Sequence, residues 1–304
     1  MEKKVFFKHN QDMNAGILFM PEDFSSEKQY AAIVISAPAG AVKEQSPSLY
    51  GRSLAAKGFV TLVFDTYHQG ESGGEPRQLE NPADRIEDIK CAVDYLTTLS
   101  YVNNEQIGAM GICSGGGYSV HTACTEKRIK AVAGVSSSDP GSWIRDGIDG
   151  EVSREELIGM LNAVSAQRTA EANGAEPVYG NFVPEEVTED MAPRSTLREA
   201  NNYYRTLRGQ HPNSTNQVSM ISLDKMIDFT TFTLVDKLLT QPLLMIVGSD
   251  ADTKKYSQDA YDRANTEKEL FEIKCASHVD LYDVQPYVNQ AVEKLASFFG
   301  AHLQ

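Results

Sequence analysis

The sequence predicts an α/β fold in which a mostly parallel sheet has helices on both faces and carries an inserted helical cap. Continuous apolar segments rich in Val and Ile, such as residues 30–36 (YAAIVIS), are typical of parallel strands that are buried on both faces. Segments with helical spacing alternate with these strands, which favours a parallel sheet. Residues 139–241 then contain no buried-strand pattern, which indicates an insertion.

The elements before the insertion follow in a regular order. Residues 5–20 alternate loosely around a turn at Asn14 and Gly16, which predicts two antiparallel edge strands joined as a hairpin. Asn81 and Pro82 are typical of the N-cap and first residue of a helix. The pattern predicts strands at 30–36, 59–65, 106–112 and 129–135, and helices at 47–57, 82–96 and 115–125.

The insertion separates two parts of the predicted core. Connections between strands and helices are typically about 2 to 6 residues long, so residues 139–241 are too long for a simple crossover. Helical patterns at 153–172, 187–205 and 223–239 predict a helical cap. The sheet resumes with strands at 242–248 and 269–275 and helices at 257–263 and 286–299, so we expect one core from residues 1–138 and 242–304.

Composition and charge limit the classes of partner. The net charge of −14 argues against nucleic acid or an anionic membrane surface, and no basic stripe is visible in the sequence. No apolar run approaches the roughly 20 residues that a membrane-spanning helix needs, and the first residues lack a signal-peptide core. We expect a cytoplasmic protein with a small-molecule substrate, no cofactor and no metal site, whose cap is a candidate surface for homodimer formation.

The stretch QIGAMGICSGGGY at residues 106–118 carries the chemistry. It reads as a strand, an abrupt turn and a small-residue helix, the arrangement of a nucleophile elbow with the pattern G-x-Nu-x-G. Only the register Gly111, Cys113, Gly115 fits, because Ser114 would have Ile112 two residues before it, where the turn needs glycine. The predicted nucleophile is therefore the Cys113 thiol.

The expected position of Cys113 favours its reactive form. A helix N-terminus stabilises negative charge, and the thiolate is the nucleophilic form of cysteine. The other cysteines, Cys91, Cys124 and Cys275, lie among apolar or small residues without metal-type spacing, so we expect them to be reduced, buried, structural thiols.

Acyl transfer at such an elbow also needs a base and a group that orients it. His278 follows the last predicted strand, in the loop CASHVDLYD, and is the candidate base. Asp250 and Asp252 follow the strand PLLMIVG, and either could orient the imidazole; we favour Asp252 slightly, because its side chain lies further beyond the strand end.

Donors for the oxyanion are expected from two loops. The amide of Ser114 is the first, and a second should come from Ala39, Gly40 or Ala41, which follow the strand at 30–36. Two titratable side chains, Glu44 and His68, lie in loops that we expect to border the same pocket, although a loop carboxylate is more often simply solvated.

The segments GICSGGGY, FDTYHQGESGGEPR and SHVDLYD resemble the α/β-hydrolase superfamily, in particular its dienelactone-hydrolase-like branch with cysteine at the elbow. The resemblance covers about residues 30–138 and 241–299 and implies an α/β-hydrolase fold with Cys113 and His278 as catalytic residues. In dienelactone hydrolases a glutamate contacts the resting thiol, so the resemblance implies a similar part for Glu44. The long insertion departs from the compact dienelactone hydrolases.

These observations predict a hydrolase that cleaves a carboxylic ester, thioester or lactone through a Cys-His-Asp triad and an acyl-enzyme. A peptidase or an acyltransferase could use the same residues, and a degenerate hydrolase fold could serve as a binding protein. Alkyl-ester chemistry, as in dehalogenases, is disfavoured, because it needs a carboxylate at the position of Cys113.

Overall fold

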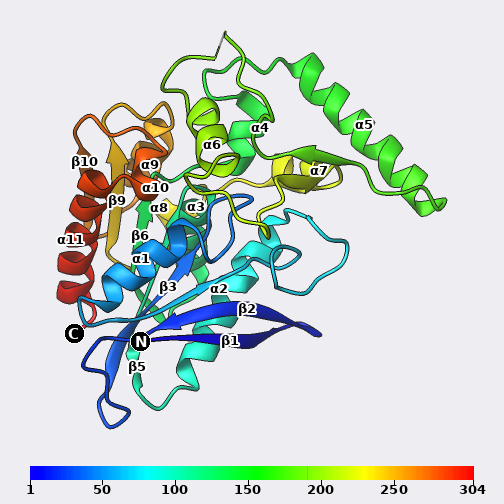
Figure 1. Ribbon diagram of the computed structural model, residues 1–304. Helices are drawn as coiled ribbons and strands as arrows, with labels where there is room; N and C mark the ends of the chain where they lie inside the picture. Colours follow the sequence, from blue (N-terminus) through cyan, green and yellow to red (C-terminus); the bar gives the residue numbers. More distant parts are fainter. Residues whose placement is uncertain (190) are drawn as a thin grey trace.

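The computed structural model describes residues 1–189 and 191–304 and contains an eight-stranded sheet in the order β1-β2-β4-β3-β5-β6-β9-β10 (Figure 1). The first two strands form an antiparallel hairpin, and β2 continues antiparallel to β4. The remaining neighbours are parallel. The strands are β1 (Glu2–His9), β2 (Asp12–Phe19), β3 (Tyr30–Ser36), β4 (Val60–Phe64), β5 (Val102–Ile112), β6 (Ile129–Val135), β9 (Leu243–Gly248) and β10 (Lys268–Ile273).

Helices cover both faces of this sheet, as the apolar strand patterns predict. On β3, Ile33 and Ile35 face one hydrophobic cluster, and Val34 faces the other, so the strand is buried on both sides. The first cluster contains residues of α1 (Ser46–Ala55) and α11 (Gln285–His302). The second contains residues of α2 (Pro82–Thr97), α3 (Ser114–Thr125) and α9 (Lys254–Arg263). Asn81 caps α2 by accepting a hydrogen bond from the Ala83 amide (3.2 Å).

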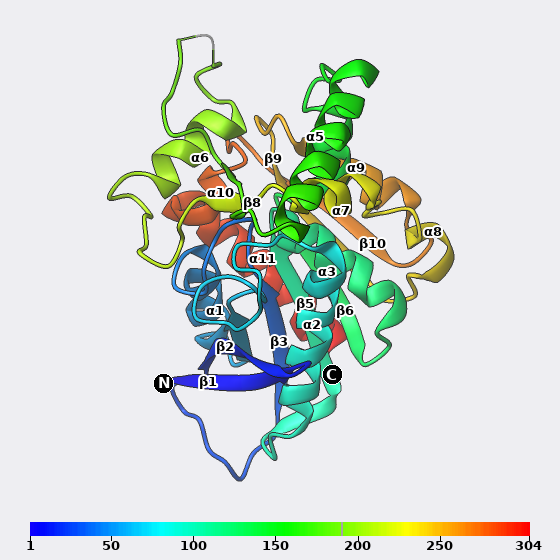
Figure 2. The same ribbon diagram turned by 90° about the vertical axis from the view of Figure 1, so that its right-hand side faces the viewer.

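The segment between β6 and β9 lies over the carboxyl ends of the parallel strands (Figure 2). It contains helices, as expected, and also a small antiparallel sheet that was not predicted from the sequence. Its elements are α4 (Pro140–Asp146), α5 (Arg154–Ala172), β7 (Tyr179–Asn181), α6 (Thr196–Tyr204), β8 (Gln217–Ser219), α7 (Ser222–Asp228) and α8 (Val235–Leu238). The helix expected at 187–205 is formed only in α6, and residue 190 of that expectation lies outside the described residues.

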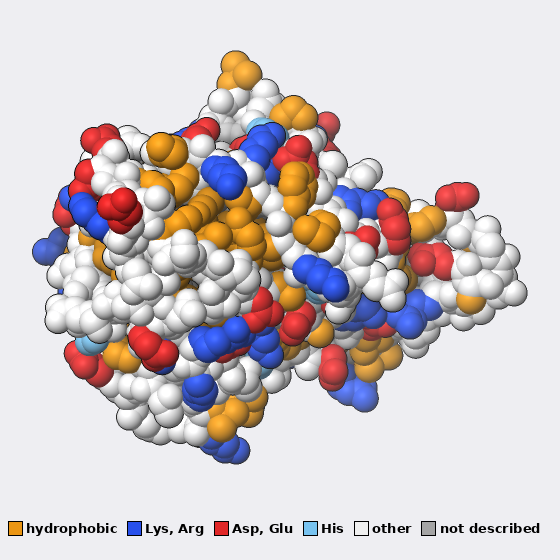
Figure 3. Space-filling model, turned by 90° about the horizontal axis from the view of Figure 1, so that it is seen from below, with side chains coloured by type: hydrophobic (Ala, Val, Ile, Leu, Met, Phe, Trp, Pro, Cys, Tyr) orange, Lys and Arg blue, Asp and Glu red, His pale blue; other side chains and the backbone are white. Residues whose placement is uncertain are grey.

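The surface carries both signs of charge. On the face shown in Figure 3, acidic and basic side chains are interspersed with groups of hydrophobic side chains. No helix within the described ranges is both long enough and apolar enough to cross a bilayer. Helix α5 extends away from the rest of the molecule (Figure 1), and Val164 is its one buried residue.

Candidate active site

Cys113 lies between β5 and α3 in a backbone conformation that residues other than glycine rarely adopt. Its φ is 55° and its ψ is −124°. Its amide donates to the Val135 carbonyl (3.0 Å), and its own carbonyl accepts from the amides of Gly116 (3.0 Å) and Ser138 (3.1 Å). The surrounding backbone therefore holds the strained turn that the motif predicts.

Two glycines allow this turn because the chain passes very close to itself. A Cβ atom on Gly111 would lie 2.1 Å from the Gly115 carbonyl group, and one on Gly115 would lie 2.3 Å from the Ser36 oxygen. Neither contact is possible without moving backbone. The requirement for glycine at the two frame positions is thus steric.

The Cys113 thiol is buried among polar groups. Its Sγ lies 3.6 Å from the Ser138 Oγ and 3.9 Å from the Ser114 Oγ. Burial by itself would raise the pKa of this thiol, but the charge of the His278 side chain and hydrogen bonding with His278, Tyr282 and Ser138 outweigh it and lower the pKa to about 6. The surroundings of Cys113 therefore favour its reactive thiolate form.

His278 is held on both ring nitrogens. It lies in the loop after β10 and is 1% exposed. Its Nδ1 forms a 2.5 Å hydrogen bond with the Thr253 Oγ1, and its Nε2 forms a 3.2 Å hydrogen bond with the Tyr282 hydroxyl group. Tyr282 belongs to the short helix α10 (Asp280–Asp283), one turn after the histidine. The imidazole thus bonds to Thr253 on one side and to Tyr282 on the other, and it also interacts with the Cys113 thiol.

The expectation that Asp250 or Asp252 orients His278 was wrong for this structure. The Asp252 carboxylate accepts hydrogen bonds from the Thr196 amide (2.8 Å) and the Thr196 hydroxyl group, at the start of α6. Asp250 is 44% exposed and accepts from the Ser249 hydroxyl group (2.7 Å). Both carboxylates are engaged away from the imidazole, and Thr253 occupies the orienting position.

The expected oxyanion segments are only partly available. Ser114 and Ala39 line the cavity at the thiol. The Ala41 amide donates to the Pro38 carbonyl (3.2 Å), so the expectation of a free amide there was wrong. Gly40 packs under the cap residue Phe182, and its carbonyl accepts from a cap serine. Of the three candidates in this loop, Ala39 is the one that lines the cavity at the thiol.

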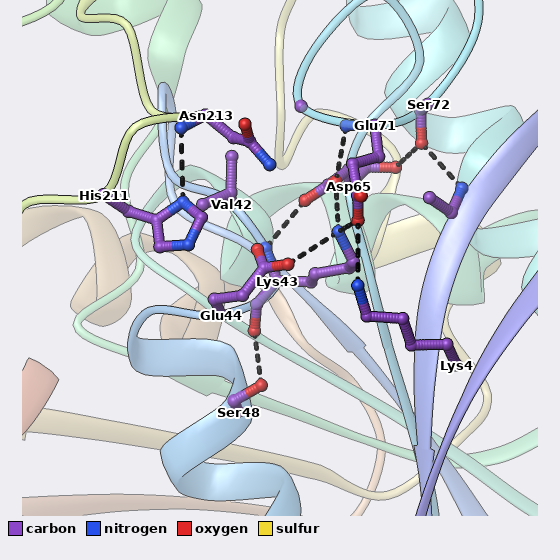
Figure 4. A network of polar contacts seen from close by, with 12 residues as sticks. Lys4, Val42, Lys43, Glu44, Ser48, Asp65, Glu71, Ser72, His211 and Asn213 are labelled. Atoms are coloured by element: carbon purple, nitrogen blue, oxygen red, sulfur yellow. Dashed lines mark hydrogen bonds and ion pairs between the residues drawn. The ribbon is translucent and has the colours of Figure 1, made fainter.

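Glu44 belongs to a buried ion network and not to the cavity at the thiol (Figure 4). The Lys43 Nζ lies 2.8 Å from Glu44, 2.7 Å from Asp65 and 2.6 Å from Glu71. Burial would lower the pKa of Lys43, but these carboxylates raise it above its ordinary value. The part for Glu44 that the resemblance implies, contact with the resting thiol, was therefore wrong for this structure.

Glu44 borders a second cavity of about 230 Å³. Arg208 also lines this cavity and forms a bidentate ion pair with Asp283, in which its Nε and Nη2 atoms donate to the two carboxylate oxygens (2.8 and 2.6 Å). His211 lies on the same wall. Tyr282 lines both this cavity and the one at the thiol, so its ring lies between them.

His68 was also expected to border the active-site pocket, and this was wrong. It is buried, has a φ of 73°, and its Nε2 lies 3.1 Å from the Asp84 carboxylate on α2. It does not line the cavity at the thiol.

The cavity at the thiol has a volume of about 240 Å³ and lies between the elbow and the cap. Cys113, Ser114 and Tyr282 line it from the core. The hydroxyl group of Tyr204, on α6, is buried and has no hydrogen-bond partner among the described residues. The other lining residues are Ala39, Pro140, Trp143, Ile144, Asn181, Phe182, Val183, Thr196, Leu197, Ala200, Val218, Leu223 and Met226.

The remaining cysteines differ from Cys113 in pKa or exposure. Burial raises the pKa of Cys91 to about 12 and that of Cys124 to about 11. Cys275 is exposed, so the expectation that it is buried was wrong; it lies in the turn after β10 with a φ of 62°. Within the described chain, no three His, Cys, Asp and Glu side chains gather as a metal site.

Comparison with known proteins identifies the family. The Dienelactone hydrolase family model matches residues 15–145. Uncharacterized protein YcjY of Escherichia coli K12 is 42% identical over 98% of this chain and 98% of its own length. The crystal structure of hypothetical protein PA2218 from Pseudomonas aeruginosa has a TM-score of 0.93 at 35% identity and covers 100% of this chain and 94% of that one. The chain is an α/β hydrolase of the dienelactone-hydrolase-like branch.

A more distant structure supports the fold of this hydrolase. The α/β hydrolase GrgF from Penicillium has a TM-score of 0.83 at 20% identity and covers 100% of this chain and 99% of that one. In the curated proteins the same relative is described as a polyketide transferase and is 24% identical over 78% of this chain and 78% of its own length.

Three residues of the candidate site in this hydrolase were missed from sequence. Ser138 follows β6, the strand next to the elbow strand, and its place at a carboxyl strand end was a usable signal. Tyr282 lies four residues after His278, which would mark it once a helical turn is assumed there. Thr253 had no local signal, because its contact with His278 depends on how the loop after β9 turns.

Proposed function

We propose that this hydrolase cleaves a carboxylic ester, thioester or lactone through a covalent acyl-enzyme on Cys113. The observation that carries the proposal is the Cys113 thiol, whose pKa is lowered to about 6 beside a buried histidine at a strained elbow. A thiol with this pKa is a nucleophile at neutral pH and needs no proton removed before it attacks.

In the first half-reaction the Cys113 sulfur attacks the carbonyl carbon, and a carbon–sulfur bond forms as the carbonyl oxygen becomes an oxyanion. The amides of Ser114 and Ala39 are the proposed donors to that oxygen. Protonated His278 then gives its proton to the leaving oxygen or sulfur atom as the bond to the carbonyl carbon breaks. The product is a thioester between the acyl group and the enzyme.

In the second half-reaction neutral His278 takes a proton from water, and the water oxygen attacks the thioester. The carbon–sulfur bond breaks, the carboxylic acid leaves, and the thiolate and the protonated imidazole are restored. Thr253 holds the imidazole through Nδ1 in both steps, in the place where a triad would have a carboxylate.

Turnover of small p-nitrophenyl esters, thioesters and lactones tests this proposal. Cys113→Ala should lower kcat/KM by about 10³-fold or more, because the covalent route is lost. Cys275→Ala is the matched control and should keep wild-type activity, since that thiol is exposed and outside the cavity. Equal turnover by wild type and Cys113→Ala would contradict the mechanism, and a ligand that binds both without any turnover would favour a binding protein.

Acyl transfer is the second candidate, because the GrgF relative is described as a polyketide transferase. The same acyl-enzyme would then react with an alcohol, amine or thiol in place of water. Adding such an acceptor and measuring the ratio of transfer product to free acid separates the two activities. Peptidase activity, cytoplasmic location and homodimer formation through the cap stay predictions; peptide substrates, cell fractionation and sedimentation would test them.

A further inference from the structure

The cavity at Cys113 is formed mainly by the cap. Trp143 on α4, Phe182 after β7, Leu197 on α6 and Met226 on α7 face the elbow across it. Because the nucleophile lies at one wall, an acyl group bound to its sulfur extends into this space. The side chains of the cap therefore determine which acyl groups fit.

Apart from the thiol itself, the described side chains that line this cavity are uncharged. Behind the lining, the Asp252 carboxylate accepts hydrogen bonds from Thr196, and Arg208, beyond Tyr282, is paired with Asp283. A carboxylate placed among these lining side chains would lose its hydration and find no cation among them to replace it, which is unfavourable.

The size of the cavity limits the length of the acyl group. An apolar cavity of about 150 Å³ holds one benzene molecule, so about 240 Å³ corresponds to an acyl group of about six to ten carbon atoms. The large, rigid side chains of Trp143 and Phe182 line this cavity, which favours a fixed limit on the length of the acyl group.

We propose that the substrate carries a neutral, apolar acyl group of about six to ten carbons, and that substrates with a carboxylate on the acyl side are excluded. The inference rests on the proposed acyl-enzyme at Cys113 and adds the class of acyl group. It excludes a carboxylate-bearing lactone even though the chain belongs to a family named for a lactone.

A matched pair of substrates tests the charge. p-Nitrophenyl hexanoate and the mono-p-nitrophenyl ester of adipic acid have acyl chains of the same length and differ by a terminal carboxylate. We expect kcat/KM to be at least about 100-fold higher for the hexanoate, because the buried carboxylate has no partner. In the series acetate, hexanoate, dodecanoate, kcat/KM should be highest for hexanoate. Equal values for the matched pair, or a preference for the adipate ester, would overturn the inference.

A charge placed in the cavity should change this ratio. Met226→Lys adds a cation to the wall, so the ratio of hexanoate to adipate turnover should fall by about tenfold or more. Leu238→Lys is the matched control, because it adds the same charge at a position that is 40% exposed and outside the cavity. Both substrates are measured on the same sample of the variant. A lower folded fraction of Met226→Lys therefore lowers both turnover rates equally and leaves their ratio unchanged. An unchanged ratio in folded Met226→Lys would count against the assignment of this cavity.

Direct binding separates this inference from the mechanism. Hexanamide and adipic acid monoamide lack a good leaving group, so calorimetry on the wild-type protein measures binding without turnover. Hexanamide should bind about tenfold or more tightly than the monoamide, even if Cys113→Ala shows that the thiol is not the nucleophile. Equal binding of the two amides would reject the inference while the mechanism could still hold.

Discussion

The elbow at Cys113 and the loop after β9 lie at carboxyl ends of the same sheet but are held by different kinds of contact. Around the elbow, backbone groups bond to backbone groups, as between the Cys113 amide and the Val135 carbonyl. In the loop after β9, the Asp252 carboxylate bonds to Thr196, which belongs to the cap. The elbow is therefore fixed by the core, while the geometry of the loop also depends on where the cap lies.

Because the elbow is fixed by backbone contacts in the core, we expect it to tolerate almost no added side-chain volume. In Gly115→Ala the new methyl group would lie 2.3 Å from the Ser36 oxygen, so we expect the free energy of unfolding to fall by about 3 kcal/mol or more and activity to be lost. Urea unfolding followed by circular dichroism measures the change.

Gly159→Ala is the matched control for that substitution. Gly159 lies inside α5 with no atom within 4 Å of the added carbon, so alanine should raise the free energy of unfolding by about 0.5 to 1 kcal/mol. If the two variants had similar stabilities, steric closure of the elbow would be refuted.

The loop after β9 should show a smaller effect, on activity. Thr253→Val keeps the shape of the side chain but removes the hydroxyl group that bonds to the His278 Nδ1, so kcat/KM should fall by about 10- to 100-fold. Thermal unfolding of the same sample shows whether the fold is kept. Wild-type activity in a folded Thr253→Val protein would show that this hydrogen bond does not position the base.

The smallest effect is expected at Asp252. Asp252→Asn keeps an oxygen that can accept from Thr196, so we expect a change of about tenfold or less in kcat/KM. An aspartate that orients a catalytic histidine is worth about 10⁴-fold in kcat, so a loss of that size would show that Asp252 reaches His278 when the cap moves. Comparing the loss of kcat/KM in Asp252→Asn with the loss in Thr253→Val thus identifies the residue that orients His278.

The difference between contacts within the core and contacts to the cap also explains which features could be predicted from the sequence. The strand at 30–36 and the glycine frame around Cys113 have local causes, burial on two faces and close backbone approach, and both are visible in the residues themselves. His278, which interacts with the Cys113 thiol in the structure, was proposed from its place after the last strand. The preference for Asp252 as the orienting residue failed, because Asp252 bonds to Thr196 of α6, 56 residues away in the chain, and Thr253 bonds to His278 in its place.

In the cap, even less of the structure could be predicted from the sequence. β7 and β8 are three residues each and pair across a long loop, so their sequences have no strand pattern long enough to read. The places of Glu44 and His68 also depended on distant partners: Lys43 with Asp65 in one case, and Asp84 in the other. Titratable residues in loops can be assigned to a pocket only when the fold around them is known.

The central claim is that the fold makes Cys113 a thiolate at neutral pH, and the pH dependence of its alkylation tests this most directly. Iodoacetamide labelling followed by mass spectrometry should give a rate at Cys113 that rises with pH around a midpoint near 6, because the thiolate fraction rises through a pKa of about 6. Exposed Cys275 is the internal control, and Cys91 and Cys124 should react last. A midpoint at Cys113 near 8.5, the ordinary value for a thiol, or faster labelling of Cys275 at pH 6, would contradict the account.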